Sequence, residues 1–244
     1  MPETAPSRSR RAWALAWRLA PAIFVVALAL ALIWPAPIGK MPMSQDHTVH
    51  LARAWMFGEL LKTGHVLGWS SYWYFGFPLG ELYPVSGDIL CAIFRGLSFG
   101  FLPWSSCYAL AFTVGYVVQG LALLRVARAL GLGAAPGVIA AVLLYLDPGV
   151  LREGGWSYTV HYGVWLQPVA CSLVWWSFAE LALLLKADGD GWRTRKLVLP
   201  AALLGIALLS HPIAMPMIAA SSVLFVLIMG FRQQPGRVLL ATTL

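Results

Sequence analysis

The stretch SQDHTVHLARAW, residues 44–55, places one acid, two histidines and one arginine close together in an otherwise apolar chain. On a helix, Asp46, His50 and Arg53 are four and then three positions apart, so their side chains share one face. An arginine can hold a phosphate through two parallel hydrogen bonds. Histidines beside a carboxylate can bind a metal or a phosphate. The residue types and their spacing therefore indicate a site for a charged ligand.

Each of these residues also has a structural interpretation, which stays open at this point. Asp46 can be the N-cap of a helix that begins near His47, because aspartate accepts hydrogen bonds from the first free N–H groups. Arg53 can extend its side chain to the lipid headgroups. His47 and His50 can donate hydrogen bonds at the membrane surface. Two histidines and one carboxylate are few ligands for a metal, so we expect no metal, with a divalent ion as the alternative.

Other polar segments supply further candidates. Residues 68–88, GWSSYWYFGFPLGELYPVSGD, combine glycines, prolines and aromatic residues, which predicts a rigid platform near the headgroups. Residues 151–165, LREGGWSYTVHYGVW, form a glycine-containing loop, with an ordinary connecting role as the alternative. A histidine in the sequence SHP ends an apolar run, and an ionisable residue at membrane depth is a functional candidate. The candidate side chains in these segments are Glu81, Tyr83, Glu153, His161 and His211.

The composition shows what must position these residues. The chain has 244 residues, of which 59% are hydrophobic and 11% charged, with a mean hydropathy of +0.74. Soluble domains carry about 25% charged residues. We therefore expect an integral membrane protein. The net charge of +7 fits membrane topology better than nucleic-acid binding, because the basic residues form no single stripe.

About 20 apolar residues are needed to span a membrane as a helix. The chain predicts an all-α bundle of about six spans, the third of them short. Between the first two spans, residues 36–102 form a long outer loop, in which residues 87–99 are expected to lie along the surface as an interfacial helix. The expected spans are Leu15–Pro35, Pro103–Leu124, Ala135–Tyr145, Val164–Leu185, Leu197–Leu209 and Ala214–Phe231.

The basic residues predict the orientation. With six spans and a cytoplasmic N-terminus, most of them fall in inner segments, as the positive-inside rule requires. Only Lys40, Arg53, Lys62, Arg95 and Arg152 then lie outside. The expected organisation is a basic cytoplasmic tail at residues 1–14, a membrane domain at residues 15–231, and a cytoplasmic end at residues 232–244, for which truncation is left open.

The residues QDHTVHLARAW, followed by GWSSYWYFGFPLGELYPV, resemble the first outer loop of bacterial membrane proteins known as pyruvoyl-tetrahydropterin synthase-related. Those proteins are similar to polyprenyl-linked glycosyltransferases of the GT-C type, which typically have more spans. The resemblance covers the chain from about residue 15 to residue 230 and includes the LLSHP sequence. The matching positions are Asp46, His47, His50, Arg53, Gly76, Pro78, Tyr83 and Pro84.

This resemblance implies an inverting glycosyltransferase in the bacterial cytoplasmic (inner) membrane. It would move a sugar from a polyprenyl-phosphate donor to an acceptor at the outer face. Asp46 would be the catalytic base, and Arg53 with His47 or His50 would bind the leaving phosphate. The implied partners are the lipid-linked sugar and membrane lipid, with a further membrane subunit left open. The alternatives are a lipid or sugar transporter or flippase, and a non-catalytic assembly subunit.

Overall fold

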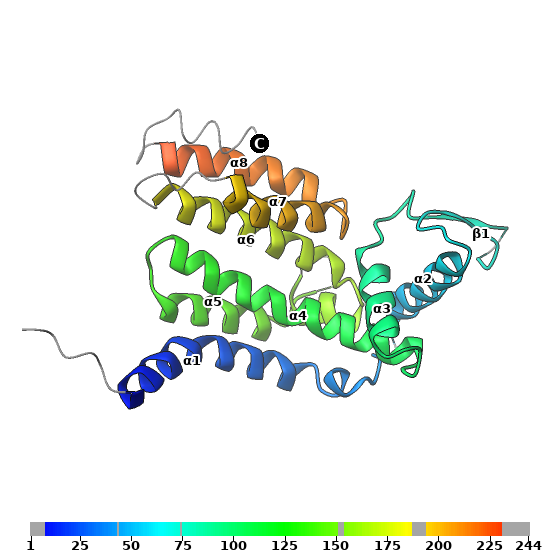
Figure 1. The fold of residues 1–244 in the computed structure, drawn as a ribbon, viewed down its shortest axis with the longest axis horizontal. Coiled ribbons are helices and arrows are strands. Elements are labelled where there is room, and N and C mark those ends of the chain that lie inside the picture. The colour runs from blue at the N-terminus through cyan, green and yellow to red at the C-terminus, as the bar shows by residue number, and fades with distance from the viewer. Residues whose placement is uncertain (1–7, 43, 74, 151–153, 187–193, 231–244) are drawn as a thin grey trace, which may run out of the picture.

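The computed structural model describes residues 8–42, 44–73, 75–150, 154–186 and 194–230. Long helices lie side by side in one elongated bundle (Figure 1). All of these helices are rich in apolar residues, which accounts for their packing against one another and for their exposed apolar faces. The helices of the bundle are α1 Arg8–Leu32, α4 Trp104–Ala129, α5 Ala134–Leu146, α6 Leu166–Lys186, α7 Thr194–Leu208 and α8 Ala214–Gly230.

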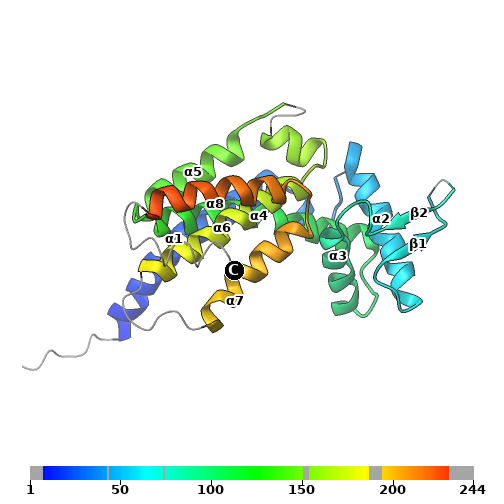
Figure 2. The same ribbon diagram turned by 90° about the horizontal axis from the view of Figure 1, so that it is seen from above.

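A smaller unit, which we call the end lobe, lies at one end of the bundle (Figures 1 and 2). It follows α1 through a short 3-10 turn at Ala36–Ile38. The two strands pair antiparallel, with Gly68 opposite Leu79. The elements of the end lobe are α2 Gln45–Lys62, β1 Gly68–Ser70, β2 Phe77–Leu79 and α3 Ser86–Leu97.

The central helix of the bundle is α4, which packs against α1, α3, α5 and α6. Small residues permit this close packing. A Cβ atom at Gly115 would lie 2.7 Å from the ring of Trp165. At Gly120, the backbone N–H donates to the Tyr145 hydroxyl at 3.0 Å, and that hydroxyl donates to the Tyr116 carbonyl at 3.0 Å. A side chain from α5 thus enters the hydrogen-bond ladder of α4.

The all-α prediction is confirmed, with the β1–β2 hairpin as a small addition. Within the residues that the structure describes, three helices are long and apolar enough to cross a membrane: Leu15–Leu32, Trp104–Ala129 and Leu166–Lys186. The other apolar helices of the bundle are shorter. The first helix begins at Arg8, inside the segment expected as a basic tail, and residues 232–244 lie outside the described part of the chain.

The end-lobe helix α3 has 12 residues. At 1.5 Å per residue it is about 18 Å long, whereas the hydrocarbon core is about 30 Å thick. The segment that follows it exposes two aromatic rings almost completely, Phe99 at 89% and Phe101 at 88%. A short amphipathic helix with exposed apolar residues is typical of an element lying along a membrane surface.

Candidate functional site

The loop before α6 contacts the N-terminus of α2. Ser44 is the N-cap, in an extended conformation, and its hydroxyl donates to the carbonyl of His161. The backbone N–H of Asp46 donates to the carbonyl of Tyr162 at 3.0 Å. The interpretation of Asp46 as the N-cap is therefore wrong. Asp46 lies inside the first turn, where its negative charge interacts favourably with the helix dipole.

Gly163 permits this contact between the loop before α6 and the start of α2. Its φ is +82°, a conformation that glycine adopts without strain. A Cβ atom there would lie 2.6 Å from the backbone nitrogen of His47. Both the backbone conformation and the close approach therefore require glycine at this position.

His47 is completely buried, and both of its ring nitrogens are engaged. Nε2 lies 2.7 Å from the carbonyl of Val160, so Nε2 carries the proton and donates it. Nδ1 then accepts from the hydroxyl of Tyr108, also at 2.7 Å. The same hydroxyl accepts from the indole N–H of Trp165 at 3.0 Å. In this arrangement His47 connects α2, α4 and the loop before α6, and neither nitrogen is left for a phosphate.

Arg53 is buried beneath Tyr83 and pairs with an acid of α3. Its Nη2 donates to Asp88 Oδ2 at 2.9 Å and to the Pro84 carbonyl at 2.9 Å. The guanidinium carbon lies 4.4 Å from the centre of the Tyr83 ring. Its Nε is buried without a partner among the described residues. Arg53 is only 4% exposed, so it does not extend to the headgroups as the structural interpretation supposed.

Tyr83 joins two histidines to this ion pair. Its ring centre lies 6.0 Å from that of His50 on α2 and 5.7 Å from that of His211, in the turn between α7 and α8. His211 Nδ1 accepts from the backbone N–H of Ile213 at 3.1 Å. We call His50, Arg53, Tyr83, Asp88 and His211 the polar cluster. Its residues come from α2, the loop between β2 and α3, α3, and the turn between α7 and α8, and it lies where the end lobe meets the bundle.

Burial sets the protonation states in the polar cluster. It lowers the pKa of His50 to about 3, and the charge of Arg53 adds to that lowering. Burial also lowers the pKa of His211 and raises the pKa of Tyr83 to about 12. For Asp88, burial raises the pKa to about 6 although the Arg53 charge opposes this. At pH 7 the cluster therefore holds neutral histidines around one ion pair.

Asp46 is exposed at the edge of this region. Its negative charge contributes to the raised pKa values of Tyr83 and Tyr158, after burial as the main cause. The Tyr158 hydroxyl donates to the side chain of Gln167 at 2.5 Å. An accessible carboxylate thus borders two neutral phenols, one in the polar cluster and one in the loop before α6.

The structure brings some predicted site residues together and not others. His50, Arg53, Tyr83 and His211 form one cluster with Asp46 at its edge. His161 is exposed, with its ring 5.0 Å from that of Tyr162, and Glu81 is exposed in the end lobe. Glu153 lies outside the described residues. The residues that sequence reasoning missed are Asp88, Tyr108 and Trp165; an acid in an otherwise apolar helix was the available signal for Asp88.

An apolar cavity of about 340 Å³ lies between α3, α4, α6 and α7, beside the polar cluster. Ser86 and Ser210 line it at one point, where the hydroxyl of Ser86 donates to that of Ser210 at 2.8 Å. The indole of Trp165 also lines it, and that ring lies 6.5 Å from the ring of His50. Trp165 therefore belongs both to the wall of the cavity and to the surroundings of the polar cluster.

No group of three or more His, Cys, Asp or Glu side chains placed to hold a metal occurs within the described residues. In comparisons with known proteins, no family model, curated protein or solved structure matches the chain.

Proposed function

We propose that this protein is a membrane glycosyltransferase that takes a sugar from a polyprenyl-phosphate donor at the outer membrane face. In this proposal the six helices of the bundle cross a bacterial inner membrane, and the N-terminus is cytoplasmic. The alternation of helix direction supports it, because the end lobe, the loop before α6 and the α7–α8 turn all gather at one end of the bundle. That end would face outward.

The distribution of basic residues supports the same orientation. The start of α1, the ends of α4 and α6 and the start of α7 all lie at the end of the bundle away from the end lobe (Figure 1). Cytoplasmic ends of membrane helices carry an excess of Lys and Arg. The basic residues near those ends are Arg125, Arg128, Lys186 and Lys196, and Arg18 lies near the start of the apolar part of α1, Leu15–Leu32.

The observation that carries the proposal is the position of Trp165 between the polar cluster and the apolar cavity. A polyprenyl phosphate has a charged head and an apolar chain, so its site must place polar and apolar surfaces side by side. The cavity of about 340 Å³ offers the apolar surface; its lining residue Trp165 has its ring 6.5 Å from that of His50, and its lining residue Ser210 directly precedes His211. Burial of a chain of CH₂ groups contributes about 0.8 kcal/mol for each group.

The proposed roles follow from accessibility. Asp46 is exposed and takes the proton of the acceptor hydroxyl as it attacks the anomeric carbon, while the bond to the donor phosphate breaks. Arg53 is enclosed, so it acts as a positioning residue. Its guanidinium contacts the ring of Tyr83, and its ion pair with Asp88 connects α2 to α3. His47 likewise fixes the start of α2. Stabilisation of the departing phosphate then falls to His211 and the Tyr83 hydroxyl, which are partly exposed, whereas His50 is buried.

The test is a transfer assay with a panel of polyprenyl-phosphate sugars and purified protein. We expect Asp46→Asn to lower the rate by about 10²–10⁴, because the amide has the same shape but cannot take a proton. Donor binding should change little. Asp147→Asn is the matched control, since Asp147 is also exposed, near the same end of the bundle, and an amide oxygen can still accept from Gly149 N–H. Activity of Asp46→Asn within a few-fold of the parent protein would remove Asp46 from the mechanism.

A further inference from the structure

A groove runs along the exposed face of α2, away from the polar cluster. It consists of three adjoining hollows of about 690, 440 and 480 Å³. The first two share Thr48, Ala52 and Trp55, and the last two share Met56 and Tyr72. The groove therefore extends from the first turns of α2 to its C-terminal end.

The length of the groove separates its far end from the proposed catalytic position. Glu59, in the last hollow, follows Asp46 by 13 positions on the same helix, which corresponds to about 20 Å along the axis. Thr48 and Val49, in the middle hollow, follow Asp46 within one turn. One end of the groove thus lies level with Asp46 along the axis of α2 but about 200° around the helix from it, and the other lies at the tip of the end lobe.

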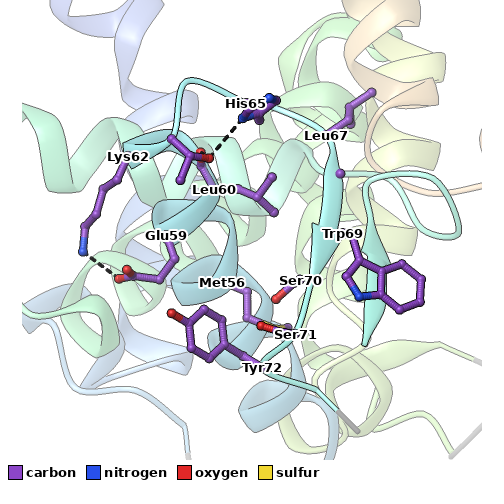
Figure 3. Close-up of a pocket in the computed structure, with 12 residues that line it drawn as sticks. Met56, Glu59, Leu60, Lys62, His65, Leu67, Trp69, Ser70, Ser71 and Tyr72 are labelled. Atoms are coloured by element: carbon purple, nitrogen blue, oxygen red, sulfur yellow. Dashed lines mark hydrogen bonds and ion pairs between the residues drawn. The ribbon is translucent and has the colours of Figure 1, made fainter. Parts of the chain in front are cut away.

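Two aromatic rings stand along the groove in fixed positions. The ring of Tyr72 packs edge to face against that of Trp55, with their centres 4.8 Å apart, so each ring restricts the movement of the other. Tyr72 nevertheless remains 62% exposed and Trp55 37% exposed. An apolar ring that is both fixed and exposed can bind a ligand without first being ordered. Figure 3 shows Tyr72 beside α2, among the residues that line the last hollow.

Polar groups line the far hollow, which Tyr72 borders (Figure 3). Lys62 Nζ lies 2.7 Å from Glu59 Oε1, so their charges offset one another. The hydroxyl of Thr63 lies 3.1 Å from Nδ1 of His65. The hydroxyl of Ser70 has no hydrogen-bond partner within the part of the chain that the structure describes, although Ser70 is 96% buried, being 4% exposed. A buried hydroxyl without a partner is unfavourable, and a ligand in the hollow can supply one.

We propose that this groove binds an oligosaccharide chain. A sugar ring has an apolar face of C–H groups and an edge of hydroxyl groups, which matches exposed aromatic rings flanked by neutral pairs of polar side chains. The offsetting charges of Glu59 and Lys62 disfavour a strongly charged ligand, and the polar tip disfavours an acyl chain. In the proposed function such a chain is the acceptor of the transfer, since the groove begins within one turn of Asp46 along the axis of α2. That acceptor role rests on the proposed function, whereas the binding itself does not.

The test measures glycan binding in the absence of any donor. The full chain is purified in a detergent without a sugar headgroup, and saturation-transfer NMR and calorimetry are run with chitohexaose, maltohexaose and mannohexaose and with their monosaccharides. We expect one hexasaccharide to bind with a Kd of about 1 mM or tighter, and its monosaccharide about tenfold more weakly. Absence of binding by all three hexasaccharides overturns the proposal.

Variants locate the site. Tyr72→Ala is expected to weaken binding about tenfold, as loss of an aromatic anchor does. Phe101→Ala is the control, because Phe101 is also an exposed aromatic residue, at 88% against 62% for Tyr72, but lines none of the three hollows. Loss of binding with Phe101→Ala and not with Tyr72→Ala overturns the placement in the groove.

A second pair of variants separates this proposal from folding and from the proposed function. Ser70→Ala should weaken glycan binding several-fold and leave Tm unchanged or higher, since the hydroxyl stabilises nothing in the free protein. Asp46→Asn should bind the glycan as the parent protein does. Glycan binding without transfer would support the glycan site in the groove and contradict the proposed transferase function. Transfer that is insensitive to Tyr72→Ala would contradict the glycan site alone.

Discussion

Arg53 of α2 and Asp88 of α3 form an ion pair at 2.9 Å, with both side chains at most 5% exposed. The two residues are 35 positions apart. The pair connects the two helices of the end lobe. The Arg53 guanidinium also contacts the ring of Tyr83, which lies against His50 and His211. A charge this deeply enclosed needs its partner, because an unpaired buried charge is costly.

Removal of one member of this pair is expected to destabilise the end lobe. Arg53→Met or Asp88→Leu alone should cost about 3–5 kcal/mol of unfolding free energy, and the double variant less than the sum of the two. Lys62→Met is the control, since the exposed Lys62–Glu59 pair contributes about 0–1 kcal/mol. Thermal unfolding in detergent, followed by tryptophan fluorescence, gives the comparison. A cost for Arg53→Met no larger than that for Lys62→Met would contradict the structural role.

Gly163→Ala is expected to displace the loop before α6 from the start of α2. The comparison variant is Gly131→Ala: the two glycines have φ values of +82° and +78°, but a Cβ at Gly131 meets nothing within 4 Å. Both variants therefore carry the same backbone strain of about 1–2 kcal/mol, and only Gly163→Ala adds a clash. Hydrogen exchange at the amides of Asp46 and Tyr162 should rise in Gly163→Ala alone. Equal exchange in both variants would show that the contact is dispensable.

His50 is expected to make the protein less stable in mild acid. Its pKa falls from 6.5 to about 3 on folding, because of burial first and then the charges of Arg53, His47 and His211. The unfolded chain therefore binds the proton more readily, so stability is full above pH 6.5 and is lost as the pH falls towards 3. Asp88, with its pKa raised to about 6, acts in the opposite direction, but it is present in parent and variant alike.

The measurement is the difference in Tm between about pH 7 and about pH 5 for the parent protein and for His50→Asn. The parent should lose more Tm over this interval than the variant does. If the Tm of both proteins falls by the same amount, the pKa of His50 is not lowered on folding as its burial requires.

The proposed orientation predicts opposite sidedness for the two ends of the bundle. Ser71 in the end lobe and Leu132 between α4 and α5 are both exposed. In a background with Cys171 replaced by Ser, a membrane-impermeant maleimide added to intact cells should label Ser71→Cys and not Leu132→Cys. Labelling of both in permeabilised cells is the control for reactivity. Labelling of Leu132→Cys in intact cells would rule out the proposed topology.

Local sequence patterns determined most of the helical architecture. The third apolar segment was expected at residues 135–145 and is the helix Ala134–Leu146, because an uninterrupted apolar run bounded by glycine and by Asp-Pro leaves few other choices. A short helix was expected at residues 87–99, and the structure has the helix Ser86–Leu97; its position at a membrane surface stays a prediction. Spacing along α2 likewise placed His50 and Arg53 on one face, since a helical period acts over three or four residues.

Tertiary packing decided what each polar residue does. His47 and His50 are three positions apart, yet both nitrogens of His47 are bonded to Val160 and Tyr108, and His50 lies against Tyr83. The partner of Arg53 and the loop that contacts Asp46 come from positions 35 and more than 100 residues away in the chain. The residues near a side chain in the sequence determine, through helical periodicity, which way it points. Its burial and its partners depend on which distant segments pack against it, and only the folded chain determines that.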